Sequence, residues 1–187
     1  MKISPSDHIQ KLINEQYKAI DDAHSRLSEI WLKDILFSFG WMTTLLLTVV
    51  PWIVWFIFRN KESSTRLMLA GLWAMLISSW LDYVGVTLGL WRYYNKLIPL
   101  IPDYIAWDFA LMPVTIMFYL QIKPQASPII KGLIFAGVTA FLAEPLFLWL
   151  GYYTYPGWNS IFSFPFFFVI YYIAHKLAHS SAIKPLL

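Results

Sequence analysis

Three acidic residues stand inside long apolar stretches of this sequence. Asp82, Asp108 and Glu144 are each surrounded in the chain by apolar and aromatic residues. A carboxyl group inside a membrane costs at least a few kcal/mol, so such groups usually face a bundle interior and mark a functional site. A cluster of buried carboxyls can hold a proton near neutral pH, which suits a general acid or a proton-coupled site.

The chain that carries these acids is too apolar for a soluble domain. Of its 187 residues, 58% are hydrophobic and 13% are charged, against about 45–50% and about 25% in typical soluble domains. The composition predicts an all-α integral membrane protein with one membrane domain over residues 1–187. The net charge of +3 is small and scattered, which argues against nucleic-acid binding, and the lack of Cys excludes disulfides and thiolate chemistry.

Apolar segments long enough to cross a bilayer recur along the chain. A spanning helix needs about 20 apolar residues, which predicts a bundle of about five transmembrane helices. The expected spans are 35–58, 67–90, 104–122, 129–150 and 158–176. The excess of Lys and Arg in the loops after the first and third spans predicts a multi-pass protein of the cell membrane with a cytoplasmic C-terminus.

An amphipathic segment over residues 6–33 precedes the first span. Apolar residues recur there at roughly helical spacing between charged ones, which predicts an amphipathic N-terminal helix with Ser6 as its N-cap. The pattern fits a helix on the membrane surface or on the bundle, and equally a polar helix that only leads into the first span.

The alternation of five spans places the three acids in one half of the bilayer. At 1.5 Å per residue, Asp82 lies roughly 13 Å, Asp108 roughly 8 Å and Glu144 roughly 10 Å from the same interface. We therefore predict these three as candidate catalytic acids. The alternative is structural, with Asp108 solvated near the interface and Asp82 paired with Arg92 or with a Trp or Tyr donor.

Aromatic residues with a polar group gather in the same half, and two interpretations are open for them. They form an interfacial aromatic belt, or some of them line a cavity where their ring faces stabilise a cation. The candidate ligand-binding residues are Trp80, Trp91, Tyr93, Trp107, Tyr152 and Trp158.

Two glycines share a helix face with Asp82. Gly85 and Gly89 are four residues apart, so we predict that they let another helix approach, either within the bundle or in a homo-oligomer. His175 and His179 have the spacing of a metal pair but no third ligand in sight. We expect them on the surface, and we expect no metal and no cofactor, since no phosphate, nucleotide or zinc motif is present.

Two stretches carry a resemblance to known families. One is residues 81–93 (Leu-Asp-Tyr-Val-Gly-Val-Thr-Leu-Gly-Leu-Trp-Arg-Tyr), followed by Pro99, Pro102, Asp108 and Pro113. The other is Ala143-Glu144-Pro145, followed by Gly151-Tyr152-Tyr153 and Trp158. Over nearly the whole chain they resemble a family of small multi-span proteins from spore-forming Gram-positive bacteria, which has no assigned activity.

The first stretch is also distantly similar to the membrane-bound lycopene cyclase domain and to integral-membrane terpene cyclases of fungal meroterpenoid pathways. That resemblance implies that membrane acids protonate an isoprenoid while aromatic residues shield the carbocation. Asp82, Asp108 and Glu144 would be the counterparts of those acids. The chain departs from the pattern after the proline, where Asp103 and Asp108 stand singly in place of paired glutamates.

These observations predict an acidic, aromatic-lined intramembrane site for an apolar or amphiphilic ligand such as a membrane lipid or isoprenoid. Two sharper hypotheses compete, and they belong to different classes. One is an acid-initiated cyclase or isomerase of a membrane isoprenoid. The other is a proton-coupled carrier or an envelope sensor subunit.

Overall fold

Four helices of the computed structural model, which describes residues 3–180, are long and apolar enough to cross a membrane. They are α2 (Phe39–Phe58), α3 (Ser64–Thr87), the continuous helix formed by α5 (Pro128–Val138), η3 (Thr139–Ala143) and α6 (Glu144–Trp149), and α7 (Ser160–Ala178). Large apolar side chains stand exposed on all four, among them Phe56, Leu76, Ile134 and Phe162. Lipid is the solvent that such a surface requires, so the prediction of a helical membrane protein is confirmed at this level.

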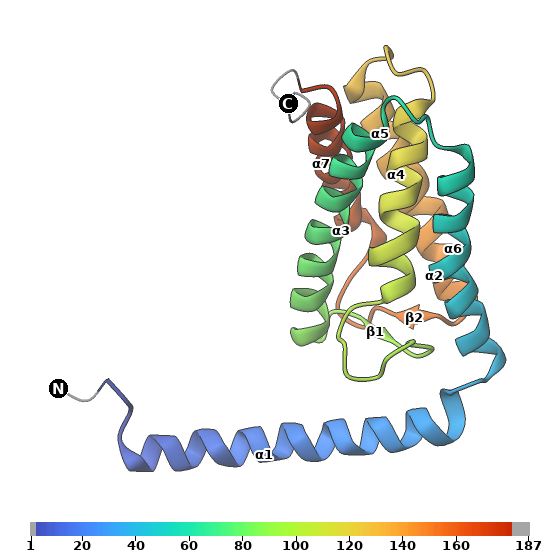
Figure 1. Cartoon of the computed structure of the whole chain (residues 1–187). Coiled ribbons are helices and arrows are strands. Elements are labelled where there is room, and N and C mark those ends of the chain that lie inside the picture. Colours follow the sequence, from blue (N-terminus) through green and yellow to red (C-terminus); the bar gives the residue numbers. More distant parts are fainter. Residues whose placement is uncertain (1–2, 181–187) are drawn as a thin grey trace.

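The remaining predicted span, 104–122, is also helical but shorter. It comprises the π-helical segment η2 (Trp107–Leu111) and α4 (Met112–Gln121). Figure 1 shows α4 between α2 and α3, and its side chains are among the most deeply buried in the protein, including Ile116 and Met117. The small residues Ala70, Gly71 and Ala74 of α3 are buried as well, which lets α3 and α4 pack closely. A count of five crossings stays a prediction.

Two prolines lie where helices change their winding. Pro113 and Pro145 each lie just after a π-helical segment, η2 and η3 respectively. A proline lacks the N–H that would bond the carbonyl four residues earlier, and neighbouring groups in a membrane bundle take over that carbonyl. For Pro113 this carbonyl belongs to Phe109, and the indole Nε1 of Trp52 donates to it at 2.7 Å.

The N-terminal helix α1 (Asp7–Ile30) lies outside the bundle. It runs across the end of the bundle in Figure 1, roughly perpendicular to the other helices, and none of its residues is buried. The predicted amphipathic helix is therefore present but is not packed on the bundle. Ser6 is its N-cap by position, although its side chain makes no capping hydrogen bond. The π-helical segment η1 (Trp31–Ile35) connects α1 to α2.

Two short strands depart from the expected all-α fold. β1 (Arg92–Tyr93) pairs antiparallel with β2 (Tyr153–Thr154), with Arg92 opposite Thr154 and Tyr93 opposite Tyr153. The backbone N–H of Gly157 also donates to the carbonyl of Leu90 at 3.2 Å. This ladder joins the connector after α3 to the connector after α6, so that both close the same end of the bundle.

Candidate functional site

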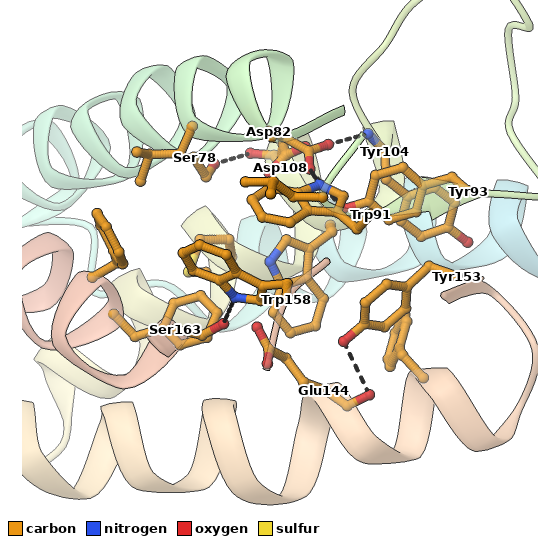
Figure 2. Close-up of a pocket in the computed structure, with 18 of the residues that line it drawn as sticks. Ser78, Asp82, Trp91, Tyr93, Tyr104, Asp108, Glu144, Tyr153, Trp158 and Ser163 are labelled. Atoms are coloured by element: carbon orange, nitrogen blue, oxygen red, sulfur yellow. Dashed lines mark hydrogen bonds between the residues drawn. The ribbon is translucent and has the colours of Figure 1, made fainter. Parts of the chain in front are cut away.

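A cavity of about 280 Å³ lies within the bundle near the end that the strands close, and all three predicted acids line it. Figure 2 shows Asp82 and Asp108 on one side and Glu144 on the other. The acids come from α3, from η2 and from the start of α6. Most of the remaining wall is apolar or aromatic, as in sites that bind small organic ligands.

Asp82 is held by three hydrogen bonds. The indole Nε1 of Trp91 and the hydroxyl of Tyr93 donate to its Oδ1 atom at 2.6 and 2.7 Å, and the backbone N–H of Tyr104 donates to Oδ2 at 2.9 Å. Arg92, offered by the sequence as a partner, does not contribute one of these bonds. A carboxyl that accepts several donors is stabilised in its ionised form, and these bonds tie α3 to the connector that follows it.

The chain reverses after α3 in order to bring these donors back. Gly89 has a φ of +72°, a left-handed conformation that glycine adopts without strain. Gly85 lies on the buried side of α3, and a Cβ atom there would overlap the indole of Trp91. Both glycines were expected to admit a neighbouring helix. The structure instead uses Gly89 for the turn and Gly85 to make room for Trp91.

Asp108 is a direct neighbour of Asp82 and is 1% exposed. Its carboxyl lies close enough to that of Asp82 for the two groups to interact electrostatically. Two carboxyl groups this close repel each other when both are ionised. The Oδ2 atom of Asp108 is buried and meets no donor within the described residues.

Glu144 lies across the cavity in a more polar corner. The hydroxyls of Ser160 and Ser163 are its polar neighbours, and Ser163 also accepts a hydrogen bond from Nε1 of Trp158 at 2.9 Å. Its Oε2 atom is buried without a hydrogen bond to any part of residues 3–180. Asp108 and Glu144 thus each keep a carboxyl oxygen that the protein leaves unpaired, and Figure 2 shows both side chains at the cavity.

Four of the six predicted ligand-binding aromatics line this cavity: Trp91, Tyr93, Trp107 and Trp158. Trp91 and Trp158 meet edge to face with ring centroids 5.3 Å apart. Trp80 does not line the cavity, because it is 64% exposed and stacks on Tyr83 at the bundle surface. Tyr152 does not line the cavity either. Its hydroxyl donates to Oγ1 of Thr43.

The tyrosines outside the helices are held as neutral donors. Burial and the nearby Asp82 carboxyl raise the pKa of Tyr93 well above its ordinary value, and burial raises the pKa of Tyr153. Their hydroxyls therefore stay protonated at any physiological pH. Tyr93 consequently remains a hydrogen-bond donor to Asp82.

Several lining residues were not singled out from the sequence as site residues. Ser78 stands one helical turn before Asp82 and donates to the carbonyl of Asp108 at 3.4 Å, so its spacing was a signal. Tyr104 and Tyr153 were visible only as interfacial aromatics. No feature of the sequence distinguished Ser163 as a site residue.

The histidine pair lies away from this cavity. His175 is 7% exposed, not at the surface as expected, and its ring stacks on that of His179 with centroids 4.0 Å apart. Within residues 3–180 no three His, Asp or Glu side chains are placed to share a metal ion.

Comparison with known proteins adds no relative: the chain matches no protein-family model, no curated protein and no solved structure.

Proposed function

We propose that this membrane protein binds an apolar or amphiphilic membrane molecule in the cavity, with Asp108 and Glu144 contacting its polar part. The observation that carries the proposal is the convergence of carboxyls from three helices on one aromatic cavity. Asp82 is saturated by its own donors, whereas Asp108 and Glu144 each keep an unpaired buried oxygen. A buried polar group without a partner is costly, so a ligand that supplies a donor there gains affinity.

The rest of the wall favours a largely apolar ligand. Phe147, Phe166, Phe167 and Ile170 line the cavity together with the tryptophans. Two carboxyls cannot pair with a fully apolar molecule, and aromatic faces attract cations. The ligand class we infer therefore has an apolar body and a cationic or hydrogen-bond-donating group, as amphiphilic lipids and isoprenoid derivatives do.

Retention of lipids by the purified protein tests this proposal. The wild type and the variants Asp108→Asn and Glu144→Gln would be incubated with a total membrane lipid extract, purified in mild detergent and analysed by mass spectrometry. We expect the wild type to retain one lipid class and each variant to retain roughly tenfold less of it, because a buried hydrogen bond to the ligand is lost.

Asp34→Asn and Glu62→Gln are matched controls, since both acids are exposed outside the cavity. They should retain the ligand as the wild type does. The proposal would be contradicted if the wild type retained no lipid class above background, or if the two cavity variants retained as much lipid as the wild type.

A second candidate function is acid-initiated isomerisation or cyclisation of a membrane isoprenoid. It is favoured by the Asp82–Asp108 pair, since two neighbouring carboxyls in an aromatic cavity retain a proton more readily than a single carboxyl does. Asp108 would give its proton to an alkene carbon, forming a C–H bond and a carbocation. Loss of a proton from a neighbouring carbon to a cavity carboxylate would restore the acid, so the reaction needs no cofactor. The distant resemblance to membrane terpene cyclases is consistent with this candidate.

Deuterium incorporation tests that chemistry. Polyprenyl alcohols and diphosphates would be incubated with the protein in D₂O, where each turnover places one deuterium on carbon. Asp82→Asn, Asp108→Asn and Glu144→Gln should abolish incorporation, and the melting temperatures of Asp108→Asn and Glu144→Gln should stay near that of the wild type. No incorporation by the wild type across this panel would count against the reaction and leave the binding proposal to its own test.

We also propose a topology for the chain. It crosses the cell membrane five times, and its C-terminus is cytoplasmic. The backbone N–H of Asn60, in the turn between α2 and α3, donates to Oε1 of Gln121 at 2.6 Å, whereas Tyr104 contacts Asp82 near the other end of α3. The segment between Tyr104 and Gln121 therefore runs nearly the length of α3, which supports a fifth crossing. Arg59, Lys61 and Lys123 lie at the Asn60 end, which favours that end as cytoplasmic.

Because the chain has no Cys, a single introduced cysteine can be labelled without background from native cysteines. In intact cells, Lys61→Cys should not react with a membrane-impermeant maleimide, whereas Arg92→Cys should react. The reverse pattern would overturn the orientation, and labelling of both would overturn the crossing scheme.

A further inference from the structure

No part of residues 3–180 covers the apolar face of α1. Its large apolar side chains are all more than 40% exposed, for example Ile13 at 43% and Leu27 at 54%. The helix lies across the bundle end and turns into α2 through η1 (Figure 1). An amphipathic helix owes most of its stability to the packing of its apolar face, so this face of the 24-residue α1 calls for a partner.

The spacing along α1 is that of a coiled coil. Steps of four and three residues alternate from residue 9 to residue 30, through Ile9, Ile13, Ile20, Leu27 and Ile30, with Gln16 and Ala23 at the two remaining positions. This is a period of 3.5 residues, which keeps a narrow seam facing another helix. In heptad terms the a positions are Ile13, Ile20 and Leu27, and the positions directed away from the seam are all polar or charged.

The composition of α1 favours a second helix over a lipid surface as the partner. Helices that lie on membranes carry Lys and Arg on the polar face and Trp, Phe or Leu on the other. Between Asp7 and Ile30 there are five acids and three Lys or Arg, a balance of −2, and there is neither Trp nor Phe. An acidic polar face is repelled by anionic lipid headgroups, whereas apolar residues that recur every 3.5 residues are typical of helices that pair in coiled coils.

We propose that α1 pairs with α1 of a second copy of this chain as an antiparallel two-helix coiled coil at the membrane surface. The direction follows from the bilayer, because two copies inserted the same way are related by a two-fold axis along the membrane normal. Such an axis reverses any direction in the membrane plane. Since α1 is roughly perpendicular to the bundle (Figure 1), its symmetry mate must run the opposite way. The proposal does not depend on what the cavity binds.

Cysteine crosslinking of the full chain in lipid nanodiscs tests the pairing and its direction. Single-cysteine variants Ile9→Cys, Ile20→Cys and Ile30→Cys would be treated with a flexible bis-maleimide. An antiparallel pair brings the middle of the seam close to itself, so Ile20→Cys should form a covalent dimer and the two end variants should not. A mixture of Ile9→Cys and Ile30→Cys should crosslink, because opposite ends meet.

A charge in the seam supplies an independent measurement. Ile20→Glu should weaken dimerisation in detergent, followed by mass photometry, by roughly tenfold or more, since it would bury an unpaired charge. Lys18→Glu is the matched control, because Lys18 lies on the polar side and its replacement should leave the dimer intact.

Three outcomes would overturn the proposal. Equal self-crosslinking at both ends and the middle would show a parallel pair. Absence of crosslinks at all three positions would show that α1 is unpaired. A cysteine at position 20 that stays uncrosslinked and is shielded from a water-soluble maleimide only in lipid would show that the bilayer covers this face.

Discussion

The indole of Trp91 occupies the space left by the missing side chain of Gly85, where an added Cβ atom would overlap its ring. From that position its Nε1 atom donates to Oδ1 of Asp82 at 2.6 Å. Gly85 and Asp82 are one helical turn apart on α3, so a single face of the helix holds both the indole and the group it bonds. This contact connects a backbone feature of α3 to the orientation of the carboxyl pair.

Gly85→Ala should therefore destabilise the protein. The added methyl group would displace Trp91 and break its hydrogen bond to Asp82, and overpacking of this kind costs about 1–3 kcal/mol. The measurement is thermal unfolding in detergent followed by tryptophan fluorescence. Gly137→Ala is the matched control, because the nearest atom to its Cβ would be Cε2 of Phe164 at 4.0 Å. An equal melting temperature for the two variants would contradict the packing described.

Tyr93→Phe should lower stability by removing a donor from a buried carboxyl. Its hydroxyl lies 2.7 Å from Oδ1 of Asp82, and hydrogen bonds to charged groups contribute about 1.5–3 kcal/mol. Tyr94→Phe is the control, since Tyr94 is exposed and next in sequence. The unfolding midpoints of both variants should be compared with that of the wild type, and we expect only Tyr93→Phe to shift.

Asp103→Asn should stabilise the protein at neutral pH and have little effect in acid. Burial and the nearby Asp82 raise the pKa of Asp103, while Lys96 opposes this, and its Oδ1 atom is buried without a partner among residues 3–180. A carboxyl with a raised folded-state pKa binds its proton more tightly in the folded protein. Its effect on stability is therefore absent below its ordinary pKa of 3.8 and becomes unfavourable as the pH rises through the folded value.

The measurement for Asp103 is the difference in melting temperature between variant and wild type at several pH values. This difference should grow from pH 4 towards pH 7. A difference that is negative at neutral pH would show that the attraction to Lys96 outweighs the effect of burial.

Lys131→Met should destabilise the end of α4. The Nζ atom of Lys131 donates to the carbonyls of Tyr119 at 2.7 Å and Ile122 at 2.6 Å, and the last carbonyls of a helix have no partner within the helix. Met retains the apolar stem but leaves both carbonyls unpaired, for a cost of about 1–3 kcal/mol. Lys123→Met, at an exposed position in the neighbouring turn, serves as the control in the same unfolding assay.

The sequence predicted the helices well because their signal is local. Runs of about 20 apolar residues identify membrane helices without knowledge of the fold, and four of the expected spans agree with the helices found to within a few residues. The short strands β1 and β2 were missed, since a two-residue ladder leaves no periodicity to detect. The alternation of the spans also led to the prediction that Asp82, Asp108 and Glu144 lie at one depth.

Tertiary structure decided how those acids differ and which aromatics face them. Asp82 is saturated because Gly89 turns the chain and Gly85 admits Trp91, neither of which follows from residue spacing alone. Trp80 and Tyr152 stand outside the cavity although their types and depth resemble those of Trp91 and Trp158. Sequence periodicity fixes the depth and the helix face of a residue, because these depend on one helix. Contact between residues on different helices depends on how the helices rotate and pack against each other, which only the folded bundle determines.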